Sequence, residues 1–283
     1  MTRHSRTDIA KQTLADLEAG SYQRDDGVRI DFAQDLQHCL SETKLYWPDD
    51  LKQVLADVGA QPSGSQATVI DVVNETTLAG IARLAAESDE PIAALNFASA
   101  KNPGGGFLDG SQAQEESLAR SSGLYPSLMK AWPYYEHHRA TASLLYSDAM
   151  IWSPHCPIIR DDEGQPLDRP RLASFITSAA PNAGAIGNNQ PEALREIPGV
   201  FRRRAEYVLA LAAAQGHRRL VLGAWGCGVF RNDPAMVADV FADLLGPRQW
   251  AKRFSRIAFS VLDTSGTSSV FRAFAERCGA SAA

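Results

Sequence analysis

Cysteine is scarce in this 283-residue sequence, which contains only four: Cys39, Cys156, Cys227 and Cys278. No two of them form a CxxC pair, and four thiols spread over this length do not make a disulfide scaffold. We therefore expect a reducing compartment and predict a cytoplasmic protein. Intrinsic disorder is disfavoured as well, because 45% of the residues are hydrophobic.

Long apolar runs and an excess of positive charge are also lacking. The longest apolar run covers residues 208–214, far short of the ~20 residues of a membrane-spanning helix, and the polar N-terminal residues do not resemble a signal peptide. Lys and Arg number 28 against 33 Asp and Glu, a net charge of −5. We therefore expect no membrane association and no stable nucleic-acid binding. A small anionic ligand is not excluded, because backbone amides can hold phosphate.

Hydrophobic periodicity predicts that strands and helices alternate along the chain. Helices are predicted at residues 7–19, 32–41, 78–86, 112–129, 202–214, 234–245 and 270–277. Strands are predicted at 28–32, 68–73, 92–97, 143–152, 172–178, 220–222 and 257–262, with a loop at 61–64 and a polar insert at 160–169. This order predicts a mixed or largely parallel sheet between helices, with ligands at the carboxyl ends of its strands.

A glycine triplet at residues 104–106 follows the strand predicted at 92–97. Glycine lets the backbone approach a ligand closely, but a bare triplet fits a flexible connection better. Beyond it, Ser111 and Gln114 match a capping box, which predicts Ser111 as the N-cap of a helix that carries Glu115 and Glu116 in its first turn.

The two adjacent glutamates have two interpretations. Acidic residues in a first turn complement the helix dipole. Alternatively, one of them is catalytic and the other positions the ligand, since adjacent helical side chains diverge by about 100° and do not reach the same atom.

A second glycine-rich loop, LGAWGCGVFRND at residues 222–233, connects a predicted strand to a helix that begins near Asp233-Pro234. Such a loop can form an anion-binding nest. Its spacing fits neither the dinucleotide nor the P-loop motif, which argues against both classes. Trp225 and Phe230 either face a ribose or a ring of the ligand, or anchor the loop in the core.

Other reactive side chains favour structural roles. His137-His138 and His155-Cys156 lack metal-ligand spacing, so we expect no metal and no cofactor. Cys227 has no histidine nearby in sequence to act as a base. The GxSxG motif of serine hydrolases is absent. Residues 74–77 (NETT) either cap a helix, which we favour, or meet a ligand.

The spacing GGG, seven residues, then QEE resembles the signature of poly(ADP-ribose) glycohydrolases. The context resembles the bacterial branch of that family, through the segments RTDIAKQTL, TKLYWPDDL, VVNETTL, LNFASAKNPGGG, RSSGLYPSL and GAWGCGVFRNDP, in this order from residue 6 to residue 234. This resemblance implies a macrodomain-like three-layer α/β/α fold with a mixed sheet and an N-terminal helical extension. It implies one domain over residues 1–283, with residues 1–60 packed on a core at 66–279.

The resemblance also implies the ligand and the site. The substrate would be poly(ADP-ribose) or ADP-ribosylated macromolecules, the product ADP-ribose, and the pathway reversal of ADP-ribosylation in the DNA damage response. Glu116 would be the catalytic carboxylate, and Glu115 would hydrogen-bond the ribose at the scissile bond. The residues implied in substrate binding are Asn96, Asn102, Gly104, Gly105, Gly106, Gln114, Gly226, Cys227, Gly228, Val229, Phe230 and, at the adenine, Glu75.

The implied reaction breaks a ribose–ribose O-glycosidic bond, which requires an acid for the leaving hydroxyl and a base for water. Glu116 would serve in turn as both, starting protonated. We expect a monomer that acts from the chain end, with Phe230 blocking further units. Two alternatives stay open: a macrodomain hydrolase that removes single ADP-ribose units from protein or nucleic acid, and a reader module that binds ADP-ribose without turnover.

Overall fold

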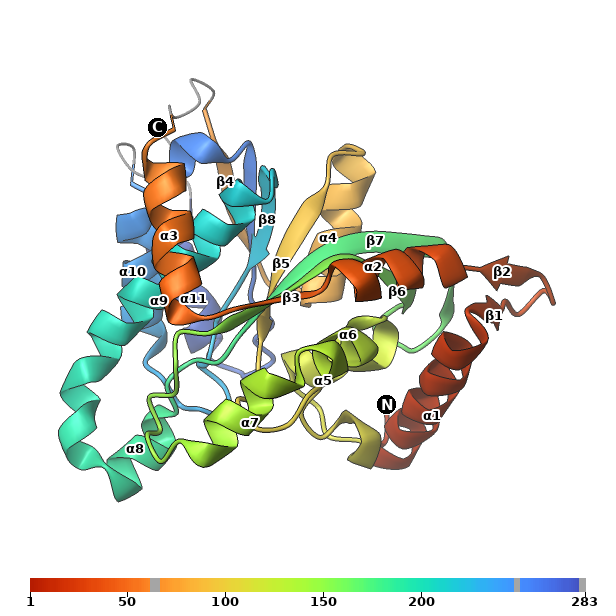
Figure 1. Ribbon diagram of the computed structural model, residues 1–283, viewed down its shortest axis with the longest axis horizontal. Coiled ribbons are helices and arrows are strands. Elements are labelled where there is room, and N and C mark those ends of the chain that lie inside the picture. Colours follow the sequence, from red (N-terminus) through yellow and green to blue (C-terminus); the bar gives the residue numbers. More distant parts are fainter. Residues whose placement is uncertain (62–66, 247–249, 280–283) are drawn as a thin grey trace.

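A seven-stranded mixed sheet forms the centre of the molecule (Figure 1). The computed structural model describes residues 1–61, 67–246 and 250–279. The strand order is β3-β6-β7-β5-β8-β9-β4, in which β3, β6 and β7 pair antiparallel and the pairs from β7 to β4 are parallel. The strands are β3 (Lys44–Tyr46), β4 (Val69–Val73), β5 (Ile92–Phe97), β6 (Met150–Arg160), β7 (Pro166–Ser178), β8 (Arg219–Leu222) and β9 (Arg256–Ser260).

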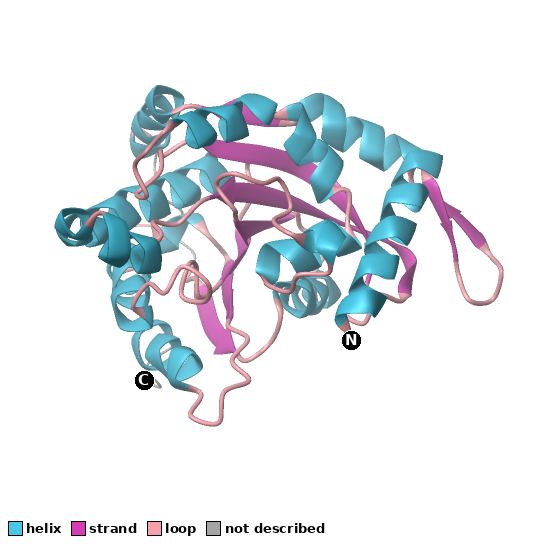
Figure 2. Ribbon diagram, turned by 90° about the horizontal axis from the view of Figure 1, so that it is seen from below, coloured by secondary structure: helices cyan, strands magenta, loops and turns pink. Residues whose placement is uncertain are grey.

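Helices cover both faces of the sheet, which gives the expected three-layer α/β/α architecture (Figure 2). Alternate residues of one strand enter the two cores: Ala93 and Leu95 of β5 face one side, and Ile92 and Ala94 the other. The first core includes α3 (Pro48–Gly59), α9 (Ile197–Ala214), α10 (Pro234–Leu244) and α11 (Ser269–Cys278). The second includes α2 (Ala33–Glu42), α4 (Thr77–Glu87), α5 (Gln114–Ser121), α6 (Leu124–Lys130) and α7 (Trp132–Ala140).

The parallel pairing of β5 with β8 brings the two glycine-rich loops together. Both strands end at the same edge of the sheet, so the loop after β5 and the loop after β8 leave it side by side. The ends of β4 and β9 lie at this edge as well, because these strands continue the parallel set. Four connections that are far apart in sequence therefore meet at one place.

The N-terminal region is only partly an extension. Helix α1 (Arg3–Ala19) and the hairpin of β1 (Ser21–Gln23) and β2 (Arg29–Asp31) lie at one end of the molecule (Figure 1). Residues 44–59, in contrast, supply β3 at the edge of the main sheet and α3 against α9. The sheet thus takes a strand from the region that the sequence placed outside the core. The loop predicted at 61–64 lies outside the described residues except for Gln61.

The strand predicted at 143–152 is wrong over most of its length. Only its last three residues belong to β6, which continues to Arg160. Tyr146 has φ +59°, which a strand does not allow. The buried Arg204 guanidinium explains the difference, because it donates to the carbonyls of Leu145 at 2.6 Å and Tyr146 at 3.0 Å. The apolar run is therefore a loop held by a side chain 58 residues away.

The helix predicted at 112–129 is two helices, α5 and α6, which differs from the single element expected. Strand β6 interrupts the helical hydrogen bonds, since Ser122 forms a bridge with Ile158 and Gly123 N donates to the Pro157 carbonyl at 2.9 Å. A Cβ on Gly123 would lie 2.8 Å from the Leu36 side chain, so a larger residue there would require this side chain to shift.

Several other boundaries differ from the prediction. β7 begins at 166 rather than 172, because the polar insert forms a hairpin with β6, and α9 begins at 197 rather than 202. Periodicity missed β1, β3, α3 and α7, and also α8 (Ala183–Asn189) and the short 3₁₀ helices Phe107–Asp109, Pro191–Glu196 and Ala251–Arg253. In residues 1–61, 67–246 and 250–279, no helix is long and apolar enough to cross a membrane.

Candidate active site

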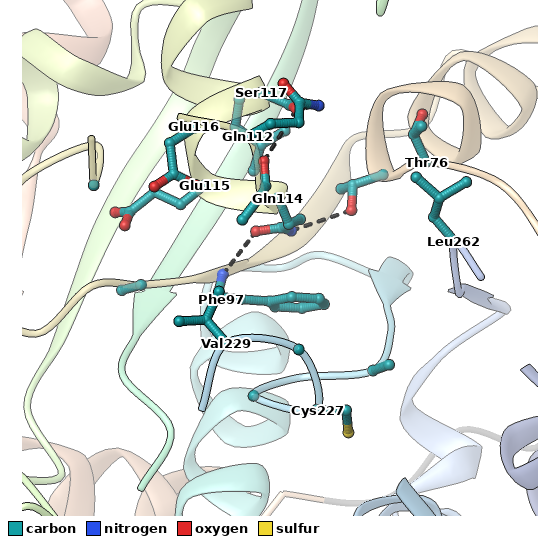
Figure 3. Close-up of a pocket in the computed structure, with 18 of the residues that line it drawn as sticks. Thr76, Phe97, Gln112, Gln114, Glu115, Glu116, Ser117, Cys227, Val229 and Leu262 are labelled. Atoms are coloured by element: carbon teal, nitrogen blue, oxygen red, sulfur yellow. Dashed lines mark hydrogen bonds between the residues drawn. The ribbon is translucent and has the colours of Figure 1, made fainter. Parts of the chain in front are cut away.

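A pocket of about 570 Å³ lies at the carboxyl ends of the parallel strands, between the two glycine-rich loops. Its volume is in the range of small-molecule sites. It is lined by residues 75–78, 97–99, 102, 105, 106, 112–118, 162, 224, 226–230, 260–262 and 270. Figure 3 shows Glu116, Gln112 and Ser117 on one side, with Cys227 and Val229 on the loop across from them.

Glu116 is held against the glycine triplet. Its Oε1 accepts a hydrogen bond from the Gly106 amide at 3.1 Å. A Cβ on Gly105 would lie 2.2 Å from the same oxygen, and Gly105 has φ +59°. Only glycine combines this backbone conformation with so close an approach of the carboxylate. The glycine triplet thus allows the close approach of the Glu116 carboxylate in addition to the backbone conformation of the loop.

Glu115 also lines the pocket but is only 3% exposed. Its Oε2 accepts from the Ser99 amide at 2.6 Å, and its Oε1 accepts from Asn96 Nδ2 at 3.2 Å. Burial raises the pKa of Glu115 to about 8, and the nearby charge of Glu116 acts in the same direction, against the two hydrogen bonds. The unliganded pocket therefore holds a proton on this carboxyl at neutral pH.

The predicted capping box is wrong. Helix α5 begins at Gln114 with Ala113 as its N-cap, and no side chain caps it. The Gln114 side chain instead accepts from the Phe97 amide at 2.9 Å and donates to the Leu95 carbonyl at 2.7 Å and to Thr77 Oγ1 at 3.1 Å (Figure 3). These hydrogen bonds of Gln114 hold the start of α5 against the end of β5. They therefore fix the backbone that carries Glu115 and Glu116.

The second loop is closed by its own polar groups. Asn232 Nδ2 donates to the carbonyls of Pro181 at 2.8 Å and Gly226 at 2.9 Å, and Asp233 caps α10 as predicted, accepting from the Ala235 amide. Gly226 has φ +73°, and a Cβ there would lie 2.5 Å from Ala180. The hydrogen bonds of Asn232 therefore join the end of the loop to Gly226.

The two aromatic residues of this loop have different environments. Trp225 is fully buried, packs edge-on against Phe201 and donates from Nε1 to the Ser178 carbonyl at 3.1 Å. It is a core anchor. Phe230 lines the pocket and lies 6.1 Å from the Tyr146 ring, centroid to centroid.

Cys227 and Glu75 both line the pocket. Burial raises the pKa of the Cys227 thiol to about 12, so it stays protonated and is not a nucleophile. Glu75 is held by Arg83 at 2.7 Å and by Ser260 Oγ at 2.9 Å. Its neighbour Thr76 caps α4 by accepting from the Ala79 amide, so the capping interpretation is confirmed for that residue.

The pocket gathers most of the residues that the sequence singled out. Asn96 and Gly104 do not line it: Asn96 is fully buried and donates to Glu115, and a Cβ on Gly104 would meet Phe107 and Ala119. In the described residues, no three His, Cys, Asp or Glu side chains are arranged to hold a metal ion.

Sequence reasoning missed Asp162, which lines the pocket from the polar insert and accepts from Thr76 Oγ1 at 2.5 Å. It also missed residues 260–262. Residues 260–262 could have been predicted from the sequence, because they end a predicted strand at the edge of the sheet where ligands bind.

Comparison with known proteins identifies the family. The family model for the microbial-type PARG catalytic domain matches residues 10–161. A crystal structure of poly(ADP-ribose) glycohydrolase (PARG) from Thermomonospora curvata is 46% identical, with a TM-score of 0.93 over 97% of this chain and 99% of that chain. The chain belongs to this family. It is therefore a glycosidase that acts on poly(ADP-ribose), with a macrodomain-like fold, as the resemblance implied.

Two further PARG structures contain ligands. The T. curvata PARG bound to the inhibitor ADP-HPD matches at 46% identity and a TM-score of 0.90, over 97% of this chain and 99% of that chain. The PARG from Deinococcus radiodurans in complex with ADP-ribose matches at 46% identity and a TM-score of 0.79, over 86% of this chain and 96% of that chain. No curated protein matches this chain.

Proposed function

We propose that the pocket binds the terminal ADP-ribose unit of a poly(ADP-ribose) chain and releases it by hydrolysis. The diphosphate lies between the glycine-rich loops, Phe230 covers the distal ribose, and Glu75 accepts from the adenine amino group. The observation that carries the proposal is the pair Glu115 and Glu116, which open α5 at a pocket between two amide-rich loops. The ADP-ribose complex of the D. radiodurans relative supports the ligand.

Glu116 is the acid and base of the proposed reaction. Held by the Gly106 amide, it donates a proton to the oxygen that leaves with the rest of the polymer, and then takes one from the attacking water. Glu115 hydrogen-bonds the ribose next to the scissile bond. A proton on Glu115 reduces the repulsion between the site and an anionic substrate.

The protonation of Glu115 leads to a prediction for the alkaline side of the pH profile of kcat/KM. We expect kcat/KM to fall above about pH 8, because ionisation of Glu115 then places a negative charge in the site that binds the anionic substrate. A pH–rate profile from pH 5 to 10 measures it. Glu115→Gln mimics the neutral carboxyl, so its lower activity should not fall at that pH; an identical alkaline limb in this variant would assign the ionisation to another group.

The stability of the same variant should depend less on pH than that of the parent. The unfolded chain ionises Glu115 above its ordinary pKa of 4.5, whereas the folded chain keeps it protonated up to about 8. Glu115 therefore lowers the stability of the fold progressively between these pH values, and Gln removes this penalty. Thermal unfolding at pH 5 and pH 8 should show that the stability of the variant relative to the parent is higher at pH 8.

We propose that the enzyme cleaves the polymer from its end, because Phe230 would block a further ADP-ribose unit beyond the distal ribose. The parent should then release ADP-ribose without short oligomers early in the digestion. Phe230→Ala should release oligomers as well, as separated by length on a gel. Early oligomers from the parent would contradict end recognition.

The function is tested by mass-spectrometric analysis of the products from defined polymer, with mono-ADP-ribosylated protein in a parallel reaction. We expect ADP-ribose from the polymer and little release from the mono-modified protein. The reverse preference would favour a mono-ADP-ribosyl hydrolase, and tight ADP-ribose binding without release would favour a reader.

We further propose a monomer that works in the cytoplasm, reverses ADP-ribosylation after DNA damage and does not bind nucleic acid stably. All four cysteines are free thiols, which suits a reducing compartment. Light scattering of the purified protein tests the monomer, and polymer accumulation after DNA damage in cells that lack the protein tests the pathway.

A further inference from the structure

Three guanidinium groups, two from α1 and one from α5, donate hydrogen bonds to the short loop of residues 109–112, which lies beside Glu116. Arg3 and Arg6, on the first turns of α1, each donate from Nε to a backbone carbonyl of residues 109–110 at 2.8 Å. Arg120, on the last turn of α5, donates to the Ser111 carbonyl at 3.3 Å and to Gln112 Oε1 at 2.5 Å. Figure 1 shows the N-terminal end of α1 beside this part of the chain.

Hydrogen bonds through Gly106 connect this loop to the carboxylate of Glu116. Ser111 N donates to the Gly106 carbonyl at 3.1 Å, and Gly106 N donates to Glu116 at 3.1 Å. Gln112, which Arg120 contacts, lines the pocket itself. The positive charges of Arg3, Arg6 and Arg120 therefore lie on the same side of the pocket as Glu116.

None of these three cations forms a salt bridge with a described residue, although the charges of Glu116 and Asp162 act on Arg120. No carboxylate lies within 4 Å of the guanidinium nitrogens of Arg3, Arg6 or Arg120 in the part of the chain that the structure describes. Other buried arginines are paired, such as Arg160 with Asp16 and Arg204 with Asp148 at 2.8 Å. Bringing like charges together without a counterion costs free energy, which an anionic ligand would offset.

Burial and the nearby charge of Arg6 also lower the pKa of Arg120, whose residue is only 2% exposed. Its guanidinium nevertheless stays charged at any physiological pH. Because it is covered, Arg120 acts on a ligand through its field, whereas Arg3 is exposed and Arg6 is half-buried, and both are able to contact one.

We propose that Arg3 and Arg6, backed by Arg120, form a subsite for the diphosphate of the ADP-ribose unit that precedes the scissile bond. This inference rests on the proposed function. Glu116 protonates the oxygen that leaves with the preceding unit, so that unit leaves the pocket on the Glu116 side, where these cations lie. A guanidinium fork suits phosphate oxygens. Helix α1 then contributes to polymer recognition as well as to packing.

The double variant Arg3→Gln/Arg6→Gln tests the subsite, because Gln keeps a hydrogen-bond donor for the loop and removes the charge. We expect the KM for long polymer to rise about tenfold at low ionic strength, with kcat unchanged, and the difference to vanish in high salt. The affinity for free ADP-ribose, measured by calorimetry, should be unchanged, because free ADP-ribose has no preceding unit.

Lys252→Gln is the matched control, since this exposed lysine precedes β9 at the opposite edge of the sheet from the pocket. An unchanged polymer KM in the double variant overturns the subsite. An equal loss of ADP-ribose affinity also overturns it, by placing the effect on the terminal unit. Failure of the parent to release ADP-ribose from polymer would instead refute the proposed function itself.

Discussion

Glu116→Gln should reduce kcat for the release of ADP-ribose from polymer by about 10²- to 10⁴-fold, the usual contribution of a general acid and base. The amide keeps the size of the side chain and an oxygen that accepts from the Gly106 amide, so the loop should keep its conformation. It has no proton for the leaving oxygen. The measurement is single-turnover release of ADP-ribose from labelled polymer.

Two further measurements make this result specific to the chemistry. The melting temperature and the ADP-ribose affinity of Glu116→Gln should match those of the parent, which would exclude a folding defect. Glu163→Gln, an exposed acidic residue of the turn between β6 and β7, is the charge-matched control and should leave kcat unchanged. A Glu116→Gln variant that keeps more than about one tenth of the parent rate would remove Glu116 from the acid role.

Gly105→Ala should reduce activity nearly as far, although it changes no chemical group. The new methyl would lie 2.2 Å from Glu116 Oε1 and 2.8 Å from its carboxyl carbon, so the carboxylate has to move. A displacement of about 1 Å can cost on the order of 10²-fold in rate. Because Gly105 has φ +59°, alanine also destabilises the fold by about 1–2 kcal/mol.

The two effects of Gly105→Ala are separable. Activity measured at a temperature well below the lowered melting point reports the displaced carboxylate alone. Gly187→Ala, on α8, is the control, because nothing lies within 4 Å of its Cβ position and its backbone is helical. If Gly105→Ala keeps full activity while it is folded, the close packing of Glu116 on the triplet has no catalytic role.

Local sequence patterns predicted the parts of the fold that depend on neighbours along the chain. The strand at 92–97 and the helix start at Asp233 need only periodicity and a capping side chain, and both are confirmed. The pairing of β5 with β8 is not readable from either strand, yet it brings the glycine-rich loops together. The resemblance to a family, rather than periodicity, implied that they form one site.

Errors arose where side chains from elsewhere override local propensity. Ser111 and Gln114 have the spacing of a capping box, but the Gln114 amide bonds to β5, and Arg120 takes the Ser111 carbonyl. The stretch before β6 is apolar enough for a strand, but Arg204 bends it into a loop. These contacts span from 9 to 59 residues of sequence, beyond any window used to detect periodicity.

The half-buried thiol of Cys227 bears on how this enzyme would respond to oxidants. Peroxides attack the thiolate, and with a pKa of about 12 this side chain is almost never a thiolate at neutral pH. Burial raises the pKa of Cys156 and Cys278 in the same way, whereas a hydrogen bond with Cys156 lowers the pKa of Cys39. The pocket loop that contains Cys227 should therefore resist oxidation by peroxides.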